Sequence, residues 1–561
     1  MPMPKRIASF IPNFWTPHLE TDADIIKSHV YRGDMVRVYI CSGELPSCYG
    51  NLLGDPETCK MCVGRRRNVF DMLDLEGRVE IQNFVNLSDE DEAVLKSYRG
   101  LKPESLEALQ EISLGSCQMG KAAFNEIVSH LRETEPKIED HREYLERVLE
   151  SAALVYLSFK NNLREFQPDC LYTFNGRFVV SHGAIAAATE LGVPFAVHDR
   201  GWLRNHYQVV QNESMHSLEV WSRKICRHWD ESELPVEERI ALGSSWFEQR
   251  IAGTNDALVN FTSSQSEDLP ASFDSSKFNV AIFNTSEFEN VGMDDYELEL
   301  YESQDLAIEK IGADLAGVPD VQIYLRVHPH LKTMDNTQTR FIKERLTDRF
   351  PNLEVIAADS PVKTYGLMKA ADAVITFGST TGVEAAYLNR PSVLLAPAFY
   401  QDLDFCFVPG SHRELMDAIA GRAFSSISEE ELEERKLRAI KYGYYMLSGG
   451  TRFTYFEENE KYEIIERASG EKVPFDPPGL AALKMEIRSR RELQDSAKPG
   501  PLRGIVKEMA GAIESLESEN QELKARIASL AEEARLRSNP AIAHRISSMG
   551  RSFKNRIGKF L

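Results

Sequence analysis

The feature that most constrains the fold is a regular alternation of apolar runs and helical patterns between residues 278 and 397. Five short runs read as buried strands, and segments with helical spacing separate them, for example at about residues 305–317. The runs are FNVAIFNTS, VQIYLRVHPH, LEVIAA, DAVITFGS and PSVLLAP. Strands that alternate with helices favour a parallel sheet with right-handed crossovers. We therefore predict a doubly wound α/β sheet in this half.

The first half repeats the pattern less regularly. MVRVYIC, at residues 35–41, reads as a buried strand, and a long polar helical stretch covers about residues 104–165. DCLYTFNGR, VVSHGAIAAATELG and VPFAVHDRG together read as a β-α-β unit. The sequence thus predicts two Rossmann-like domains, at residues 1–270 and 271–470, that face each other across a cleft holding the active site.

The C-terminal part has a different character. Residues 471–501 contain VPFDPPG and SAKPGP and are expected to form a linker, and residues 502–537 carry a heptad repeat. Val506, Ile513, Asn520, Ile527 and Ala534 fall at position a, and Met509, Leu516, Leu523 and Leu530 at position d. Branched residues at a with Leu at d favour a parallel dimeric coiled coil, hence a homodimer. The alternative is an amphipathic helix packed on its own domain.

A second amphipathic pattern covers residues 540–561. Apolar residues recur there at steps of three and four, basic residues occupy the opposite faces, and no acidic residue occurs. A basic amphipathic helix of this kind is suited to an anionic membrane interface. We therefore expect contact with the inner membrane surface; the alternative is docking on an acidic face of this protein.

Composition narrows the function classes. A chain of 561 residues is too long for one core, and a net charge of −21 argues against a nucleic-acid partner. No stretch approaches the ~20 apolar residues that span a bilayer, and the N-terminus lacks the pattern of a cleaved signal peptide. The expected location is therefore the cytoplasm, peripheral on the inner face of the cell membrane.

Four of the eight cysteines cluster near the N-terminus in the pattern C-x6-C-x10-C-x2-C. The last two have the spacing of a zinc knuckle, and four thiolates can close a tetrahedral site, which would be structural because no position stays open. Unligated thiols are an equal alternative, an iron–sulfur cluster is a weaker one, and no redox cofactor is expected. The cluster consists of Cys41, Cys48, Cys59 and Cys62.

Polar residues gather where the predicted strands of the second domain end, which is the edge where open α/β sheets bind ligands. A histidine in RVHPH can donate to a phosphate, and the hydroxyl-rich turn in FGSTTGVE can cradle an anion. Glu384 is placed to accept hydrogen bonds from ribose hydroxyls; the alternative is an ordinary helix start with a Glu favoured by the dipole. The predicted donor-binding residues are Arg326, His328, Ser360, Tyr365, Ser379, Thr380, Thr381, Gly382 and Glu384.

The first domain is expected to bind the acceptor through the loops FNGRF and HDRGW. Asp199 is the candidate general base, or a stabiliser of positive charge on the sugar. Asn175, Arg177 and Arg200 are candidates for holding an anionic acceptor or the donor phosphate. The alternative is a structural ion pair between Asp199 and Arg200. Glu287, after the first strand of the second domain, is a second candidate acid or base, and His328 completes the catalytic candidates.

RVHPH followed by DSPVKTYGLMKAADAVITFGSTTGVEAAYLNRPSVL resembles the capsule polysaccharide biosynthesis family, over roughly residues 275–400. The pattern is also similar to CDP-glycerol glycerophosphotransferases and bacterial sialyltransferases. The resemblance implies a GT-B glycosyltransferase fold in which His328, Ser379 and Thr380 contact the donor phosphate and nucleotide, and it points to a CMP-linked sugar. The acidic D/E-D/E-G motif of sialyltransferases is not found in the sequence.

Together these features predict a glycosyltransferase that moves a sugar from a nucleotide-activated donor, its co-substrate, to a glycan or glycolipid acceptor of capsule or lipopolysaccharide. A nucleotide-sugar epimerase is one alternative, because that class also uses two Rossmann-like domains. A catalytically inactive, membrane-tethered scaffold of polysaccharide synthesis is the other.

Overall fold

The computed structural model describes residues 3–75, 77–254, 265–266, 269–459 and 463–473. The described residues up to Val473 belong to one compact unit, and Lys498–Leu561 lie outside the described residues. The predicted coiled coil at 502–537, the basic helix at 540–561 and most of the predicted linker therefore also lie outside them.

The first sheet has seven strands, and the chain reverses its winding direction in the middle of it. The strands are β1 (Arg6–Ile11), β2 (Met35–Ile40), β3 (Glu80–Asn83), β4 (Cys170–Phe174), β5 (Phe195–Arg200), β6 (His206–Gln211) and β12 (Thr451–Arg452). Their order is β12-β6-β5-β4-β1-β2-β3. Strands β1 to β5 are parallel, β6 runs antiparallel to β5, and β12 runs antiparallel to β6. The winding reverses between β1 and β4, and such switch points are where parallel sheets bind ligands.

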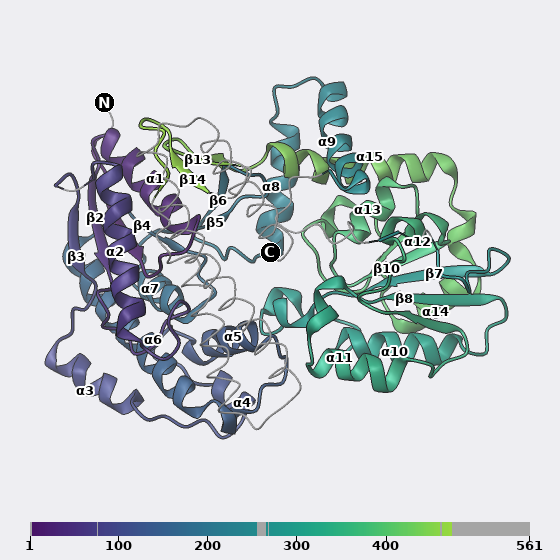
Figure 1. Ribbon diagram of the computed structural model, residues 1–561, viewed down its shortest axis with the longest axis horizontal. Helices are drawn as coiled ribbons and strands as arrows, with labels where there is room; N and C mark the ends of the chain where they lie inside the picture. The colour runs from purple at the N-terminus through teal and green to yellow at the C-terminus, as the bar shows by residue number, and fades with distance from the viewer. Residues whose placement is uncertain (1–2, 76, 255–264, 267–268, 460–462, 474–561) are drawn as a thin grey trace, which may run out of the picture. The chain divides into compact units, whose positions relative to one another are not determined.

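Helices cover both faces of this sheet (Figure 1). The helices are α1 (His18–Tyr31), α2 (Pro56–Met72), α6 (Arg142–Phe166) and α7 (Val179–Glu190). In β1, Ala8 and Phe10 join the apolar cluster of α6 and α7, whereas Ile7 and Ile11 join that of α1 and α2. Because side chains alternate along a strand, an apolar strand of this kind must be buried on both sides.

The second sheet confirms the strand–helix alternation predicted from residues 278–397. Its strands are β7 (Phe278–Phe283), β8 (Val321–Arg326), β9 (Leu353–Ile356), β10 (Ala373–Thr376) and β11 (Ser392–Leu394). They are parallel in the order β11-β10-β7-β8-β9, so the winding reverses between β7 and β10. The protein is thus an α/β protein with two largely parallel sheets.

Helices also flank both faces of the second sheet, as Figure 1 shows. They are α10 (Gln304–Leu315), α11 (Thr337–Phe341), α12 (Thr364–Ala370) and α13 (Thr381–Tyr387). Val280 and Ile282 of β7 pack with α10, while Ala281 and Phe283 pack with α12 and α13. After α11 the chain makes a π-helical turn, Ile342–Leu346.

The helical stretch predicted over about residues 104–165 is divided into several helices. The segment contains three helices, α4 (Leu106–Gln110), α5 (Met119–Leu131) and α6. Arg132 ends α5 in a left-handed conformation with φ 55°, and the chain leaves that helix before Pro136. The last helix is largely buried rather than polar, because it packs along α7 over the first sheet.

Two helices far apart in the sequence, α9 (Val236–Ala252) and α15 (Glu429–Ser448), meet through glycines. A Cβ atom on Gly443 would lie 2.4 Å from the carbonyl oxygen of Gly243, and one on Gly243 would lie 2.5 Å from that of Ile440. Backbone atoms cannot move aside as the end of a flexible side chain can. The close contact between the two helices therefore requires glycine on both of them.

After α15 the chain returns to the first sheet as β12 and then forms the hairpin of β13 (Phe456–Glu458) and β14 (Ile464–Glu466). Asp24 of α1 anchors this return, because its Oδ1 accepts the backbone N–H groups of Thr454 at 2.9 Å and Tyr455 at 2.8 Å. The end of the described chain is therefore part of the first sheet's structure. The remaining helices are α3 (Asp89–Tyr98), α8 (Leu218–Asp230) and α14 (His412–Ala420).

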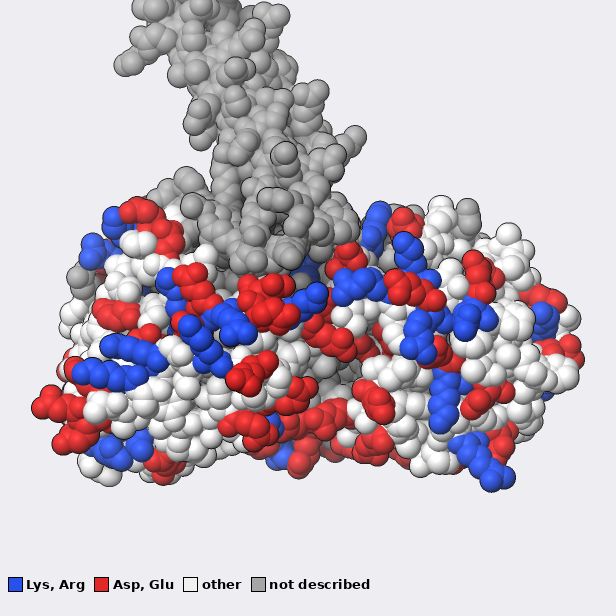
Figure 2. Space-filling model, turned by 90° about the horizontal axis from the view of Figure 1, so that it is seen from below, with Lys and Arg blue, Asp and Glu red and all other residues white. Residues whose placement is uncertain are grey.

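Charges are mixed over the surface in view. Figure 2 shows acidic and basic side chains interspersed, so the excess negative charge is not gathered in one region of this face. None of the helices in the described ranges combines the length and the apolar composition needed to span a bilayer.

The glycine contact between α9 and α15 gives a first prediction. Gly443→Ala should destabilise the protein by about 2 kcal/mol or more, because the new methyl group overlaps a carbonyl oxygen. Gly64→Ala is the matched control: Gly64 lies in α2, and a Cβ there would have nothing within 4 Å. It should stabilise by about 0.5–1 kcal/mol, because alanine favours a helix. Urea unfolding of both variants measures the difference, and equal effects would contradict the proposed contact.

Candidate functional site

The histidine predicted at the carboxyl end of β8 lies at the switch point of the second sheet. The Asn284 side-chain oxygen, just after β7, accepts the backbone N–H of His328 at 2.8 Å. His328 Nδ1 in turn accepts the backbone N–H of His330 at 3.2 Å. Burial lowers the pKa of His328 to about 4, so its ring is neutral at pH 7. With Nδ1 acting as acceptor, the proton is on Nε2, which makes that nitrogen a donor.

The turn after β10 is shaped by two glycines. Gly378 has φ +80°, and a Cβ there would lie 2.8 Å from the carbonyl oxygen of Pro397; a Cβ on Gly382 would lie 2.5 Å from the Tyr400 hydroxyl. Hydrogen bonds fix the rest of the turn: the Ser379 N–H donates to Thr376 Oγ1 at 3.2 Å, and the Thr381 N–H to Ser379 Oγ at 3.3 Å. The predicted hydroxyl-rich turn is thus built next to β7 at the same edge.

Glu384, predicted to meet ribose hydroxyls, is 3% exposed and forms an ion pair with Arg250 of α9, at 2.8 Å between Oε1 and Nε. The Arg250 guanidinium also donates to Thr380 Oγ1 at 3.4 Å, and Tyr365 interacts with the same carboxylate. Any ribose contact of Glu384 would therefore share its carboxylate with Arg250. The sequence analysis missed Arg250, because no local pattern links residues 134 positions apart.

Arg326 and Ser360 are brought together by a hydrogen bond from the Arg326 side chain to the Ser360 backbone. The Arg326 guanidinium is buried and donates to the carbonyl oxygens of Val327 at 3.1 Å, Ala357 at 2.5 Å and Ser360 at 3.2 Å. It therefore joins the end of β8 to the loop after β9. Burial lowers its pKa to about 10, which still leaves it charged at pH 7.

Asp199 lies at the carboxyl end of β5, beside the switch point of the first sheet. Its carboxylate accepts hydrogen bonds from the Asn175 side chain and from the backbone N–H of Arg200. His18 Nδ1 lies 3.7 Å from Asp199 Oδ1, and burial lowers the pKa of His18 to about 4, so this imidazole is neutral. Asp199 therefore accepts hydrogen bonds from an amide side chain and a backbone N–H, beside a neutral imidazole.

Arg200 pairs with Glu458 of β13 at 2.7 Å, and that pair anchors the returning chain. Glu287 caps α10: its Oε1 accepts the backbone N–H of Gln304 at 3.0 Å. Burial raises the pKa of Glu287 to about 6. Arg200 and Glu287, both predicted to act in the site, thus make contacts that stabilise the fold.

A cavity of about 270 Å³ opens at the carboxyl edge of the first sheet. Its lining combines aromatic side chains with a few polar groups, as in pockets that bind small molecules. Tyr49 is held in its wall by stacking on His130 and Phe178, with ring centroids 4.4 and 4.0 Å apart. The main lining residues are Asn13, Trp15, His18, Tyr49, Glu126, Phe174, Asn175, Phe178 and Asp199.

A second cavity, of about 340 Å³, shares Asn175 with the first and reaches residues Gly292 to Asp295 of the second half of the chain. Lys121 and Arg177 bring positive charge to it, and His216 Nε2 donates to Asn175 Oδ1 at 3.2 Å. One guanidinium nitrogen of Arg177 is buried, and no hydrogen-bond partner for it is found within the described ranges.

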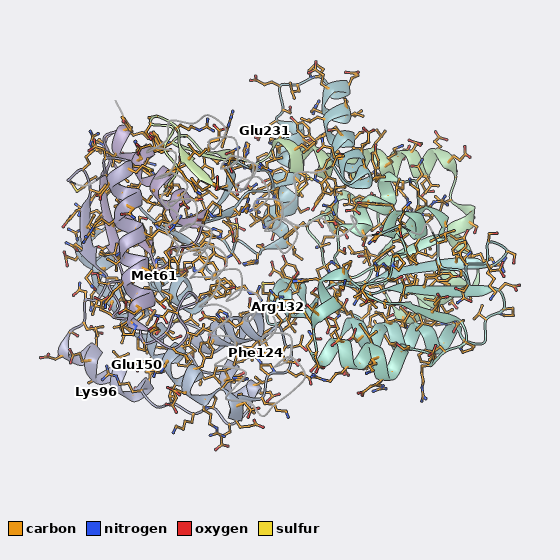
Figure 3. The ribbon with its side chains drawn as sticks, in the orientation of Figure 1. Met61, Lys96, Phe124, Arg132, Glu150 and Glu231 are labelled. Atoms are coloured by element: carbon orange, nitrogen blue, oxygen red, sulfur yellow. The ribbon has the colours of Figure 1, made fainter. Side chains whose placement is uncertain are left out.

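The two edges are joined by side chains. Arg177 donates to the carbonyl oxygen of Glu289 at 2.9 Å, and the Glu289 carboxylate lies 3.0 Å from His330 Nδ1. Helix α5 adds contacts: Phe124 packs against Gly292, and the carbonyl oxygen of Arg132 accepts the Asn336 side-chain amide at 2.8 Å (Figure 3). The predicted acceptor loop FNGRF is thus connected, through Arg177 and Glu289, to the turn after β8 that contains His328, Pro329 and His330. This turn is called the HP turn below.

The sequence analysis missed most of the cavity wall. His18, Tyr49, Glu126 and His216 come from four separate segments, and each lies in a stretch without a recognisable motif. Among the residues of the wall, only Asn13 could have been predicted from the sequence. It directly follows an apolar run, and the carboxyl ends of parallel strands share one edge of the sheet.

The four predicted metal-ligating cysteines line one small cavity of about 20 Å³, and all four are free thiols. Burial raises the pKa of Cys41, while the amides of Leu45, Gly43 and Glu44 act in the opposite direction. As the thiols stand, no group of three or more His, Cys, Asp or Glu in the described part of the chain is arranged to hold a metal ion.

Residues 298–403 match the model of a family described as capsule polysaccharide biosynthesis protein. The match confirms, over this segment, the resemblance predicted from the HP turn and the hydroxyl-rich turn. No curated protein matches the sequence.

Several solved structures are similar at low sequence identity. The β-Kdo 2,4 transferase of KpsC from Thermosulfurimonas dismutans has 14% identity and a TM-score of 0.31, covering 57% of this chain and 87% of that one. The β-Kdo 2,7 transferase of the same KpsC has 11% identity and a TM-score of 0.28, covering 47% and 79%. UDP-GlcNAc 2-epimerase from Neisseria meningitidis, bound to UDP-GlcNAc, has 10% identity and a TM-score of 0.27, covering 79% and 98%. These TM-scores are too low to support an argument.

Glu126 gives the second prediction. It is fully buried in the cavity wall, accepts the Tyr144 hydroxyl at 3.0 Å and the Val179 N–H at 3.1 Å, and has its pKa raised by burial to about 7. A carboxyl with a raised native pKa contributes stability that is complete below its unfolded pKa of 4.5 and is lost as pH rises to about 7. The free energy of unfolding should therefore fall by about 1.4 kcal/mol per pH unit from this group alone.

Glu126→Gln should remove that slope, because an amide does not titrate and can still satisfy both partners. Urea unfolding of wild type and variant at several pH values gives the difference between the two curves. If that difference stays constant between about pH 5 and 7, Glu126 is ionised throughout and the assignment is wrong.

Proposed function

We propose, from the match of residues 298–403 to the capsule polysaccharide biosynthesis family, that this protein is a GT-B glycosyltransferase. It moves a sugar from a nucleotide-activated donor to a hydroxyl of a surface glycan or glycolipid. The observation that supports the proposal is the contact between the two carboxyl edges through Arg177 and Glu289. We propose on this basis that Asp199 and the HP turn act in one site.

The donor nucleotide would bind at the edge of the second sheet. Neutral His328, with its proton on Nε2, would donate to an oxygen of the leaving phosphate, and the hydroxyls of Ser379 and Thr380 would add donors. Such fixed donors stabilise the negative charge that develops as the bond between the anomeric carbon and the phosphate oxygen breaks. The HP motif favours a CMP-linked sugar.

The acceptor sugar would occupy the aromatic cavity of the first sheet. Its hydroxyl oxygen attacks the anomeric carbon, Asp199 takes the hydroxyl proton, and the nucleotide leaves with the electron pair of the broken bond. We assign the base to Asp199 rather than Glu287, because the Glu287 carboxylate caps a helix whereas Asp199 lines the cavity.

The sequence further supports a cytoplasmic location, with the basic helix at 540–561 on the inner face of the membrane and dimerisation through residues 502–537. A dimeric coil would present two such helices, so weak anchors would act together.

Nucleotide binding gives the third prediction. Among CMP, CDP, UDP and GDP, one nucleotide should raise the melting temperature, because a ligand at 100 times its Kd adds about 2.7 kcal/mol to the native state. His328→Ala should lose the shift, and Asp230→Asn, on the exposed end of α8, should keep it. A shift that survives in His328→Ala would place the nucleotide elsewhere. No shift with any nucleotide would favour the scaffold alternative.

Asp199 gives the fourth prediction. Asp199→Asn should lower kcat by about 10²- to 10⁴-fold in a transfer assay, since general bases contribute that much, while the nucleotide-induced thermal shift stays unchanged. Asp230→Asn again serves as the control. Retained turnover in Asp199→Asn would exclude it as the base. Conversion of the donor sugar without any acceptor would indicate the epimerase.

A further inference from the structure

The proposed transfer reaction leaves the cysteine cluster unused. We propose that Cys41, Cys48, Cys59 and Cys62 together bind one zinc ion, which fixes the loop at residues 41–51 in the wall of the acceptor cavity. The assignment of the loop to an acceptor cavity rests on the proposed function, whereas the metal site itself does not.

Three separate pieces of chain bring the four cysteines to one place. Cys41 directly follows β2, and Cys48 lies in a loop closed by two backbone hydrogen bonds with Asn51, at 3.1 and 2.8 Å. Cys59 and Cys62 lie in the first turns of α2, where a spacing of three puts both on one face. Met61, labelled in Figure 3, marks their place on that helix.

The start of α2 is fixed independently of any ligand. The Asp55 carboxylate accepts the Thr58 N–H at 3.1 Å, and Pro56 occupies the first helical position. The position of Cys59 and Cys62 is therefore set by the helix cap. The cavity between the cysteines, about 20 Å³, is the size of a single ion or water.

The sulfur atoms receive hydrogen bonds of the kind that support metal-bound thiolates. The Gly43 N–H donates to Cys41 Sγ at 3.3 Å, and the Asn51 side-chain amide donates to Cys59 Sγ at 3.3 Å. Donors directed at ligating atoms orient them and stabilise their negative charge. A buried pair of ordinary thiols needs no such donors.

A buried positive charge beside the cluster is a second, independent observation. Arg66 is 3% exposed, and its guanidinium donates to the carbonyl oxygen of Cys41 at 3.2 Å. Negative charge on Cys62, Cys41 and Glu44 acts on this guanidinium in the direction that stabilises its charged form. Four thiolates around one Zn²⁺ carry two negative charges, so the bound site would add anionic charge beside Arg66.

Zinc binding would be coupled to loss of protons. As free thiols the side chains do not form a preassembled metal-binding group, so rotation about their Cα–Cβ bonds has to close the tetrahedron. Each thiol that joins the ion releases its proton to solvent. Thiolate ligands in a closed tetrahedral set favour zinc over hard cations such as Mg²⁺.

The cluster adjoins the aromatic cavity. Asn13, Cys48 and Gly50 line both the small cavity between the cysteines and the larger one, and Tyr49 lies between two of them. An ion that holds Cys48 would therefore hold Tyr49 in its stack with His130 and Phe178. Zinc loss should change acceptor binding rather than donor binding.

The test is the metal content of the purified full-length chain, measured by mass spectrometry of the elements. We expect about one zinc ion per chain in the wild type, a loss in Cys41→Ser and Cys62→Ser, and no change in Cys226→Ser, a half-buried cysteine of α8. In case the serine variants fold poorly, wild-type protein exchanged into Co²⁺ should show the absorption of a tetrahedral thiolate complex. Absence of zinc, zinc unchanged in Cys62→Ser, or iron with sulfide in its place would overturn the proposal.

Kinetics then separate the two proposals. Zinc-depleted protein should keep its nucleotide-induced thermal shift and show a raised KM for the acceptor. Zinc at one per chain without transfer activity would leave the metal site standing and remove the proposed function. Transfer with an unchanged acceptor KM after depletion would show that the ion does not shape the cavity.

Discussion

The contact between Gly243 and Gly443 is the constraint on which the connection between the two sheets depends. The chain leaves the first sheet for the second after α9 and comes back through α15, so these two helices carry both crossings. Their backbones come so close that a methyl group on either glycine would overlap a carbonyl oxygen of the other helix. Because the returning chain then pairs as β12 and is held by Asp24 and by Glu458 with Arg200, the first sheet is complete only when the second has been built.

This arrangement explains where the arginines go. A nucleotide-binding protein is expected to use arginine for phosphate. Here Arg326, Arg200 and Arg250 are engaged by carbonyl oxygens or carboxylates of the protein, and they join segments that lie far apart in sequence. At the edge of the second sheet, the groups that the proposed function assigns to the phosphate are the neutral imidazole of His328 and the hydroxyls of Ser379 and Thr380. Stabilisation of a leaving group there would rest on directed hydrogen bonds, whose effect depends on geometry more than on net charge.

The sequence analysis succeeded where local pattern decides. Apolar runs located β7 to β11, and His328 and Ser379 follow β8 and β10, which are the two neighbours of β7 in the sheet. It failed where burial depends on partners, as for the helix α6, which reads as polar because one side of it is exposed. The ion pairs of Glu384 and Arg200 span 134 and 258 residues, and no periodicity encodes such partners. The cavity wall likewise combines single residues from separate segments.

The two edges differ in how they are held, and the difference bears on specificity. The edge of the second sheet, proposed to bind the donor, is built from strand ends, glycines and backbone hydrogen bonds, which leave little freedom for its shape. The edge of the first sheet, proposed to bind the acceptor, depends on the loop at residues 41–51, which lies outside the sheet ladder and contributes Tyr49 to the wall. A loop can change without disturbing the sheet. An enzyme family with one donor chemistry and many acceptors would keep its donor-binding edge and vary its acceptor-binding edge, and a loop that is free to vary needs its own anchor. The cysteines at both ends of this loop, together with those at the start of α2, are placed to provide that anchor.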